Sequence, residues 1–230
     1  MTTYTETIYP QDKTNTYPQK LGNYIYKRFF SSSGLRSPKI LDIGCCTGKA
    51  LRCFKQNQNF DLYGIDVRDE FVAGITFKEC NLEKESIPFE DNHFDFVYSK
   101  SVLEHVFNTD NFVSEALRVL KPGGKFVALT PDWRSQQSIF WDDYTHVKPF
   151  TRKGLRDALI IHGFEEVECE YFYQLPFIWN SPWLSFVPKI ISLLPDWLKW
   201  KDEEQRNTKD RKLIRFSKEK MLLVCGVKEK

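Results

Sequence analysis

The chain has 230 residues, of which 41% are hydrophobic and 28% charged, and its formal net charge is +2. This size suits one domain with a buried core, and the near balance of acids and bases argues against a nucleic-acid partner. The six cysteines show neither metal-ligand spacing nor a disulfide framework, so we expect no metal site and reduced thiols in a cytoplasmic protein. Neither a signal peptide nor a membrane-spanning apolar run is expected.

The first segments in chain order are an arm and a helix. Residues 1–20 are polar and rich in Thr and Tyr without periodicity, which predicts a mobile arm. Apolar residues then recur at helical spacing from Leu21 to Phe29, and the turn at 31–34 ends that predicted helix.

Residues 39–50 read KILDIGCCTGKA, which predicts a buried strand, a tight turn and the start of a helix over 49–57. Gly44 and Gly48 permit a sharp turn and close approach of a ligand. A phosphate-binding P-loop needs four residues between its glycines and then Lys and Ser/Thr, which this loop lacks. Cys46 replaces the middle glycine of a dinucleotide fingerprint, which weakens that alternative. The loop favours a nucleotide-like cofactor.

The next predicted strand covers residues 60–65 and ends at Asp66. A carboxylate about 20 residues beyond such a turn suits the two hydroxyls of a ribose. Nicotinamide cofactors and S-adenosylmethionine share that ribose, so Asp66 supports both.

The remaining elements alternate between strands and helices. Strands are predicted over 75–80, 94–99 and 125–130, with a helix over 112–120 and a turn at Lys121–Gly124 before the last of these strands. This alternation predicts an α/β fold with a doubly wound, mostly parallel sheet and a ligand beyond the carboxyl ends of its strands.

Four blocks in this order resemble the class I S-adenosylmethionine-dependent methyltransferases of type 11. They are the Asp42–Gly48 loop, the strand end at Asp66, the block 87–106 with its Val-Leu-Glu-His sequence, and the Leu-Lys-Pro-Gly-Gly turn. The resemblance covers residues 39–130 as a cofactor-binding core. It implies a Rossmann-like sheet of seven strands, in which 164–171 and 221–227 form an antiparallel edge pair. It also implies S-adenosyl-L-methionine as methyl donor and S-adenosyl-L-homocysteine as product.

The same resemblance implies a set of cofactor-binding residues. Asp42 would orient the loop and the methionine amine, Asp66 would bind the ribose with Val67 beside it, and the Ser99–Lys100 backbone would lie beside the sulfonium. For His105 a structural role and a cofactor-side role are equally open. The full set is Asp42, Gly44, Cys45, Gly48, Asp66, Val67, Asn81, Leu82, Ser99, Lys100 and His105, with Asn81 and Leu82 at the adenine.

Residues 131–150 follow a strand end, so we expect a substrate loop over the crevice. Methylation of a hydroxyl or amine requires loss of a proton, for which imidazole is suited near neutral pH. His146 is the candidate base, with Asp142 or Asp143 orienting it. The alternative is that His146 anchors the loop by bonding backbone and that Thr151 caps the next helix. Positioning alone also accelerates methyl transfer.

Residues 175–217 form an insert before the last strand, rich in Trp and Pro and then in charge. Its prolines exclude one long helix. The insert fits a pocket wall or a homodimer contact, which we favour, and also a membrane surface.

The stretch from Thr145 to Thr151 is loosely similar to methyltransferases of sugar and surface-polysaccharide pathways, which implies a small sugar-like acceptor, such as a nucleotide-sugar or glycan precursor. The alternatives are a quinone or lipid methyltransferase at a membrane, a nicotinamide-dependent oxidoreductase, and a non-catalytic cofactor-binding protein.

Overall fold

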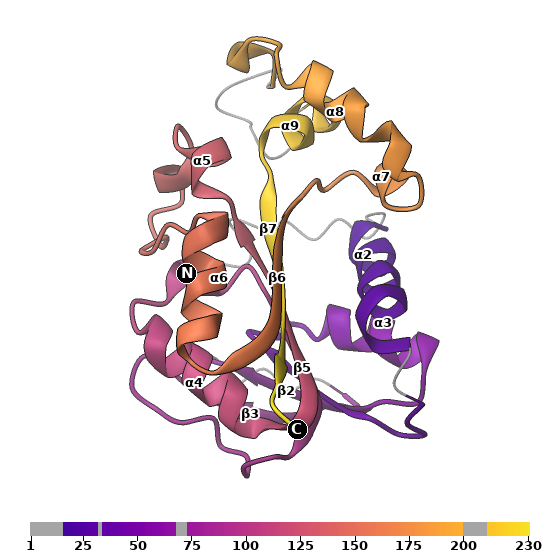
Figure 1. Cartoon of the computed structure of the whole chain (residues 1–230), viewed down its shortest axis with the longest axis vertical. Helices are drawn as coiled ribbons and strands as arrows, with labels where there is room; N and C mark the ends of the chain where they lie inside the picture. Colours follow the sequence, from indigo (N-terminus) through magenta and orange to yellow (C-terminus); the bar gives the residue numbers. More distant parts are fainter. Residues whose placement is uncertain (1–15, 32–33, 68–72, 200–210) are drawn as a thin grey trace.

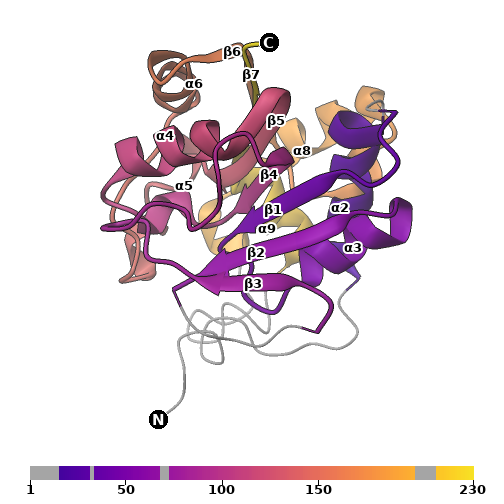
Figure 2. The same ribbon diagram turned by 90° about the horizontal axis from the view of Figure 1, so that it is seen from below.

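The computed structural model describes residues 16–31, 34–67, 73–199 and 211–230. It contains a seven-stranded sheet in the order β3-β2-β1-β4-β5-β7-β6. Only β7 runs antiparallel to its neighbours, β5 and β6, among the described pairings. This arrangement confirms the predicted Rossmann-like sheet with its antiparallel edge (Figures 1 and 2). The strands are β1 Lys39–Ile43, β2 Asp61–Asp66, β3 Thr76–Glu79, β4 Phe94–Lys100, β5 Leu120–Pro131, β6 Phe164–Phe172 and β7 Met221–Lys228.

Helices cover both faces of the sheet, as Figure 1 shows. Helices α2 (Tyr17–Ile25) and α3 (Lys49–Asn57) pack on one face, and α4 (Thr109–Val119) and α6 (Arg152–Ile161) on the other. Successive strand residues point to opposite faces. Thus Ile40 belongs to the core beneath α2 and α3, while Leu41 belongs to the core beneath α4 and α6.

Two predicted boundaries were wrong. Helix α2 begins at Tyr17, so the end of the predicted 1–20 arm is helical, while residues 1–15 lie outside the described part. Pro18 fits there because a first-turn N–H has no intrahelical acceptor. The helix continues as the π-helix η1, Tyr26–Phe30.

The second error concerns the Lys121–Gly124 segment, which was predicted as a turn between a helix that ends at Leu120 and a strand over 125–130. In the structure β5 begins at Leu120, which pairs with Phe94, and the register shifts before Lys125 pairs with Phe96. Gly123, with φ of 77°, supplies the left-handed residue that this irregularity needs. The glycine turn is therefore a bulge within a longer strand.

The insert forms short helices, as its prolines predicted. They are α7 (Pro176–Trp179), η5 (Pro182–Ser185), α8 (Phe186–Ile191), η6 (Asp196–Lys199) and α9 (Lys212–Lys218). Because β5 and β6 are both antiparallel to β7, they run in the same direction. The insert therefore follows the carboxyl end of β6, on the side of the sheet where the carboxyl ends of β1, β4 and β5 also lie (Figure 1).

Candidate cofactor and acceptor site

The glycine loop turns back sharply between β1 and α3. Gly44, Cys46 and Gly48 have φ angles of 77°, 46° and 67°. A Cβ on Gly44 would lie 2.3 Å from Cγ2 of Val102, so both the backbone angle and the space demand glycine. The N–H groups of Gly44 and Cys45 donate to the Ile65 carbonyl at 2.9 and 3.1 Å, which fixes the loop against β2.

Two predicted carboxylates meet at this loop. Asp66 Oδ2 accepts a hydrogen bond from the Cys46 N–H at 2.9 Å, so this residue supports the loop in addition to any diol contact. Asp42 is buried, and burial followed by the negative charge of Asp66 raises its pKa well above the ordinary range. The Lys100 ammonium opposes that rise.

The end of β4 also adjoins the loop. The buried Ser99 hydroxyl donates to the Ile43 carbonyl at 3.0 Å, which ties β4 to the end of β1. Lys100 Nζ donates to Ser101 Oγ at 3.2 Å. Burial lowers the pKa of Lys100, and the carboxylates of Glu104 and Asp42 partly offset this. Val67, just past β2, is exposed.

The predicted adenine residues have local structural roles. Asn81 Oδ1 accepts from the Glu83 N–H at 3.0 Å, which forms a short side-chain turn after β3. Leu82 is buried in the hydrophobic core. An amide oxygen has two lone pairs, so Asn81 can still accept from an adenine amine.

The Val-Leu-Glu-His segment holds the predicted substrate loop in place. Leu103–His105 is a 3-10 helix, η3. The Glu104 carbonyl accepts from the N–H groups of Val147 and Lys148 at 2.8 and 3.1 Å. Its buried carboxyl accepts from Thr130 Oγ1 at 2.9 Å, and burial raises the pKa of Glu104 to about 7. Sequence reasoning missed Glu104, although the motif that contains it was the available signal.

The two histidines of the site lie side by side, with ring centroids 4.8 Å apart. His146 Nδ1 is 2.6 Å from the Phe140 carbonyl of η4 (Phe140–Asp142), and its Nε2 is 3.9 Å from Asp143 Oδ2. His105 Nδ1 is 2.9 Å from Thr145 Oγ1. Burial, and next the neighbouring His146, lower the pKa of His105. Asp143 therefore approaches His146, while Asp142 is exposed.

The structure contains both contacts of the alternative in which His146 anchors the loop and Thr151 caps the next helix. The ring of His146 bonds backbone, and Thr151 Oγ1 accepts from the Gly154 N–H at 3.2 Å at the start of α6, which confirms the predicted cap. The backbone bond to Phe140 does not exclude a role as base, because it engages only one ring nitrogen.

Glu104, His105 and His146 form the one set of three ligand-type side chains in the described residues whose ligand atoms all come within 4.8 Å of one another. Each already has a protein partner, in Thr130, Thr145 and Phe140. These hydrogen bonds account for the closeness of the three side chains without a bound ion.

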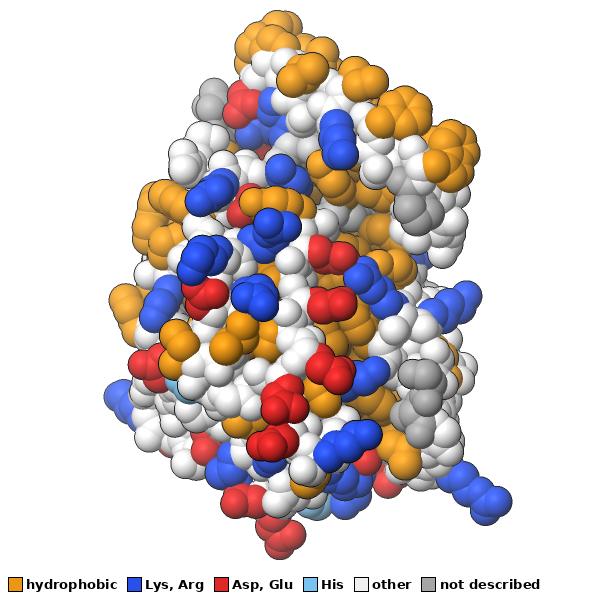
Figure 3. Space-filling model, viewed as in Figure 1, with side chains coloured by type: hydrophobic (Ala, Val, Ile, Leu, Met, Phe, Trp, Pro, Cys, Tyr) orange, Lys and Arg blue, Asp and Glu red, His pale blue; other side chains and the backbone are white. Residues whose placement is uncertain are grey.

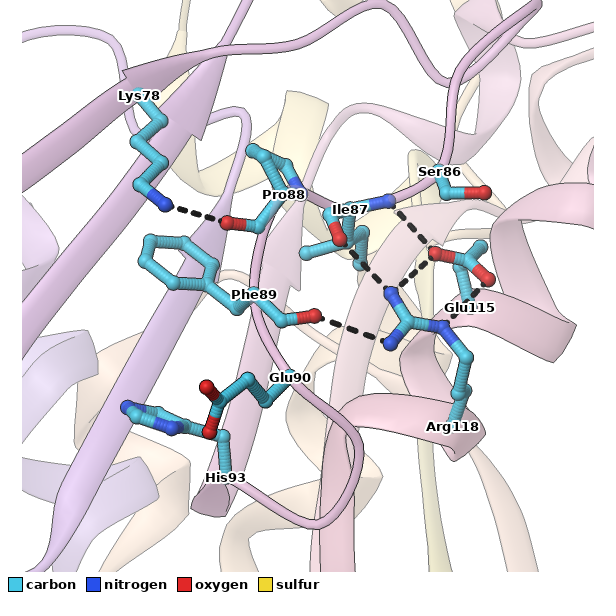
Figure 4. A pocket seen from close by; sticks show the side chains of 9 residues that line it. All are labelled: Lys78, Ser86, Ile87, Pro88, Phe89, Glu90, His93, Glu115 and Arg118. Carbon is cyan, nitrogen blue, oxygen red and sulfur yellow. Dashed lines mark hydrogen bonds and ion pairs between the residues drawn. The ribbon is translucent and has the colours of Figure 1, made fainter.

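A pocket of about 580 Å³ lies apart from the predicted site residues (Figure 4). Arg118 crosses one side of it, donates to the carbonyls of Ile87 and Phe89, and pairs with Glu115. These bonds support the segment that leads into β4. The lining residues include none of the predicted site residues: they are Lys78, Ser86, Ile87, Pro88, Phe89, Glu90, His93, Glu115 and Arg118.

Comparisons with known proteins agree with this geometry. Residues 41–128 match a family model described as "Methyltransferase domain". The chain is 28% identical over 146 residues to phosphoethanolamine N-methyltransferase 2 of Caenorhabditis elegans, covering 57% of this chain and 33% of that protein. It is 34% identical over 122 residues to the ubiquinone/menaquinone biosynthesis C-methyltransferase UbiE of Shewanella pealeana, covering 46% and 48%. These matches span between a third and a half of the curated relatives.

A solved structure shares the fold. Phosphoethanolamine N-methyltransferase 2 of Haemonchus contortus, in complex with S-adenosyl-L-methionine, aligns with a TM-score of 0.60 and 19% identity over 91% of this chain and 52% of that one. The strand order, the glycine loop and the family match lead to one assignment: residues 41–128 form a methyltransferase domain.

Proposed function

We propose that the protein transfers a methyl group from S-adenosyl-L-methionine to an oxygen or nitrogen of a small molecule and releases S-adenosyl-L-homocysteine. The observation that carries the proposal is the meeting of the Asp42–Gly48 loop with Asp66, where a carboxylate at a strand end bonds the loop itself. The methionine part would lie over the loop and the ribose at Asp66. The Asp66 carboxylate also suits the cationic donor, because opposite charges attract most strongly where water is excluded.

His146 is the proposed base. A neutral ring that donates its Nδ1 proton to the Phe140 carbonyl presents Nε2 as the basic nitrogen. The methyl group would leave the sulfonium sulfur for the acceptor atom, whose proton would pass to Nε2. Asp143, 3.9 Å from that nitrogen, would stabilise the resulting imidazolium. His105, whose lowered pKa favours its neutral form, would stay uncharged beside it.

The proposed acceptor is a sugar, nucleotide-sugar or glycan precursor. Trp141 and Tyr144 are exposed on the substrate loop, where aromatic faces can stack on the apolar face of a sugar ring. A quinone or lipid acceptor is the second candidate, favoured by the exposed apolar side chains of the insert at the same edge of the sheet. A cytoplasmic location fits the six free thiols.

Calorimetric titration with S-adenosyl-L-methionine and with NAD(P), followed by assay of S-adenosyl-L-homocysteine release with sugar, quinone and amine acceptors, tests the proposal. We expect the methionine cofactor alone to bind and one acceptor class to support release. Binding of NAD(P) alone would indicate an oxidoreductase, and binding without release from any acceptor would indicate a non-catalytic protein.

A further inference from the structure

The insert presents a stripe of large apolar side chains to solvent. We call this the insert face and define it as Phe177, Trp183, Phe186, Ile190, Leu193, Leu194, Trp197 and Leu213, all exposed. Trp183 and Trp197 expose 72% and 73% of their surface. Trp183, Phe186 and Ile190, in η5 and α8, are three or four residues apart, which is the spacing that helices normally bury. Hydrophobic side chains line the upper margin of Figure 3, over α7 and α8.

Four charged side chains of the insert and the residue after α9 are buried or half-buried on its inner side. Lys199 and Glu219 are both 3% exposed, with Lys199 Nζ 3.5 Å from Glu219 Oε1, and Arg215 Nε donates to Glu219 Oε2 at 2.7 Å. Lys218 Nζ donates to the carbonyls of Ser192 and Leu194 at 2.7 and 2.6 Å. Turning the apolar stripe inward would break this buried network, which is strongly unfavourable. The packing therefore holds the insert face outward.

The charge of the insert selects among the surfaces that could cover this face. Among the described residues of the insert, the exposed charged side chains are the basic Lys189, Arg211 and Lys212 and the acidic Asp196, which leaves a net outward charge of +2. A two-fold dimer would place this charge against its own copy. An anionic bilayer is complementary to it, and tryptophan with Lys or Arg is typical of the headgroup region.

We propose that the insert face docks on an anionic membrane surface. No described helix has the length and apolar character needed to cross a bilayer, so the insert would lie in the interface. Since the insert leaves β6 at the edge where β1, β4 and β5 end, docking would bring that edge close to the lipid. The crevice would then take a lipid-borne acceptor, a step that rests on the proposed function. This changes our preference from a pocket wall or dimer contact to a membrane contact.

The test is sedimentation of the full chain with phosphatidylcholine vesicles, with and without phosphatidylglycerol, at low and high salt. We expect binding that requires the anionic lipid and weakens with salt. Leu193→Ser should reduce binding about tenfold or more, because a leucine that the bilayer would bury is replaced by a polar group. Ile161→Ser on α6 is the matched control: Leu193 and Ile161 are 84% and 79% exposed, and only Leu193 is in the insert.

Three results would overturn the docking proposal. The first is failure of the wild type to bind either vesicle, and the second is equal loss of binding in the two variants. The third is a wild-type dimer that Leu193→Ser dissociates, without vesicle binding, which would assign the face to a second copy. Calorimetry with S-adenosyl-L-methionine on all three proteins monitors folding. Calorimetry also separates the docking proposal from the proposed function, because a wild type that does not bind the cofactor would contradict only the proposed function.

Discussion

Replacing Glu104 with Gln tests whether a buried carboxyl under the substrate loop opposes folding at neutral pH. Burial raises the pKa of Glu104 from 4.5 to about 7 in the folded protein. Below pH 4.5 the group is protonated in both states and has no effect. As pH rises through this range the unfolded chain releases the proton first, so the folded state becomes relatively less stable. The full difference corresponds to about 3 kcal/mol above pH 7.

The assay is urea unfolding of the wild type and Glu104→Gln from about pH 5 to about pH 8, analysed by linear extrapolation. Gln keeps an oxygen that can accept from Thr130 Oγ1, so the variant should fold. We expect the free energy of unfolding of the variant, relative to that of the wild type, to increase by about 2–3 kcal/mol between the two pH values. A difference between the two proteins that stays constant with pH would refute the reasoning.

Three further predictions concern the cofactor loop and the base. Asp66→Asn should retain an acceptor for the Cys46 N–H and the melting temperature, while weakening S-adenosyl-L-methionine about tenfold or more in calorimetry; equal affinity would remove Asp66 from the ribose site. His146→Asn can still donate to the Phe140 carbonyl but cannot act as base, so kcat should fall about 10²–10⁴-fold with little change in melting temperature; unchanged kcat would leave His146 as an anchor only. Gly44→Ala should destabilise by about 2 kcal/mol or more in urea unfolding, and adding Val102→Ala should restore part of that loss by removing the clash, whereas full additivity of the two changes would contradict the contact.

The positions of the first strands along the chain could be predicted from the sequence because each signal was local. An apolar run ending in Asp42, a turn with Gly44 and Gly48, and an acid at position 66 each depend on a few adjacent residues. Helix 49–57 was predicted at its exact bounds for the same reason. The bulge in β5 was missed because pairing of Leu120 with Phe94 depends on a distant segment, not on the Pro-Gly-Gly sequence.

The candidate site was predictable in its residue types but not in its bonding. The sequence named Asp66, yet only the fold reveals that its carboxylate also supports the glycine loop. Likewise it named His146 but could not assign Asp143 rather than Asp142 as the carboxylate beside it. Glu104 was overlooked because its importance comes from burial and from its backbone contacts to residues more than 40 positions away.

The antiparallel pairing of β6 with β7 has a consequence for how such a chain can diversify. Antiparallel neighbours require only a short connection, yet here the chain from 173 to 220 lies between them. The sheet is complete without those residues, so they can change in length and composition while the proposed donor site on β1, β2 and β4 keeps its shape. The insert, and with it the acceptor and the cellular location, can thus change in evolution while the rest of the domain stays the same.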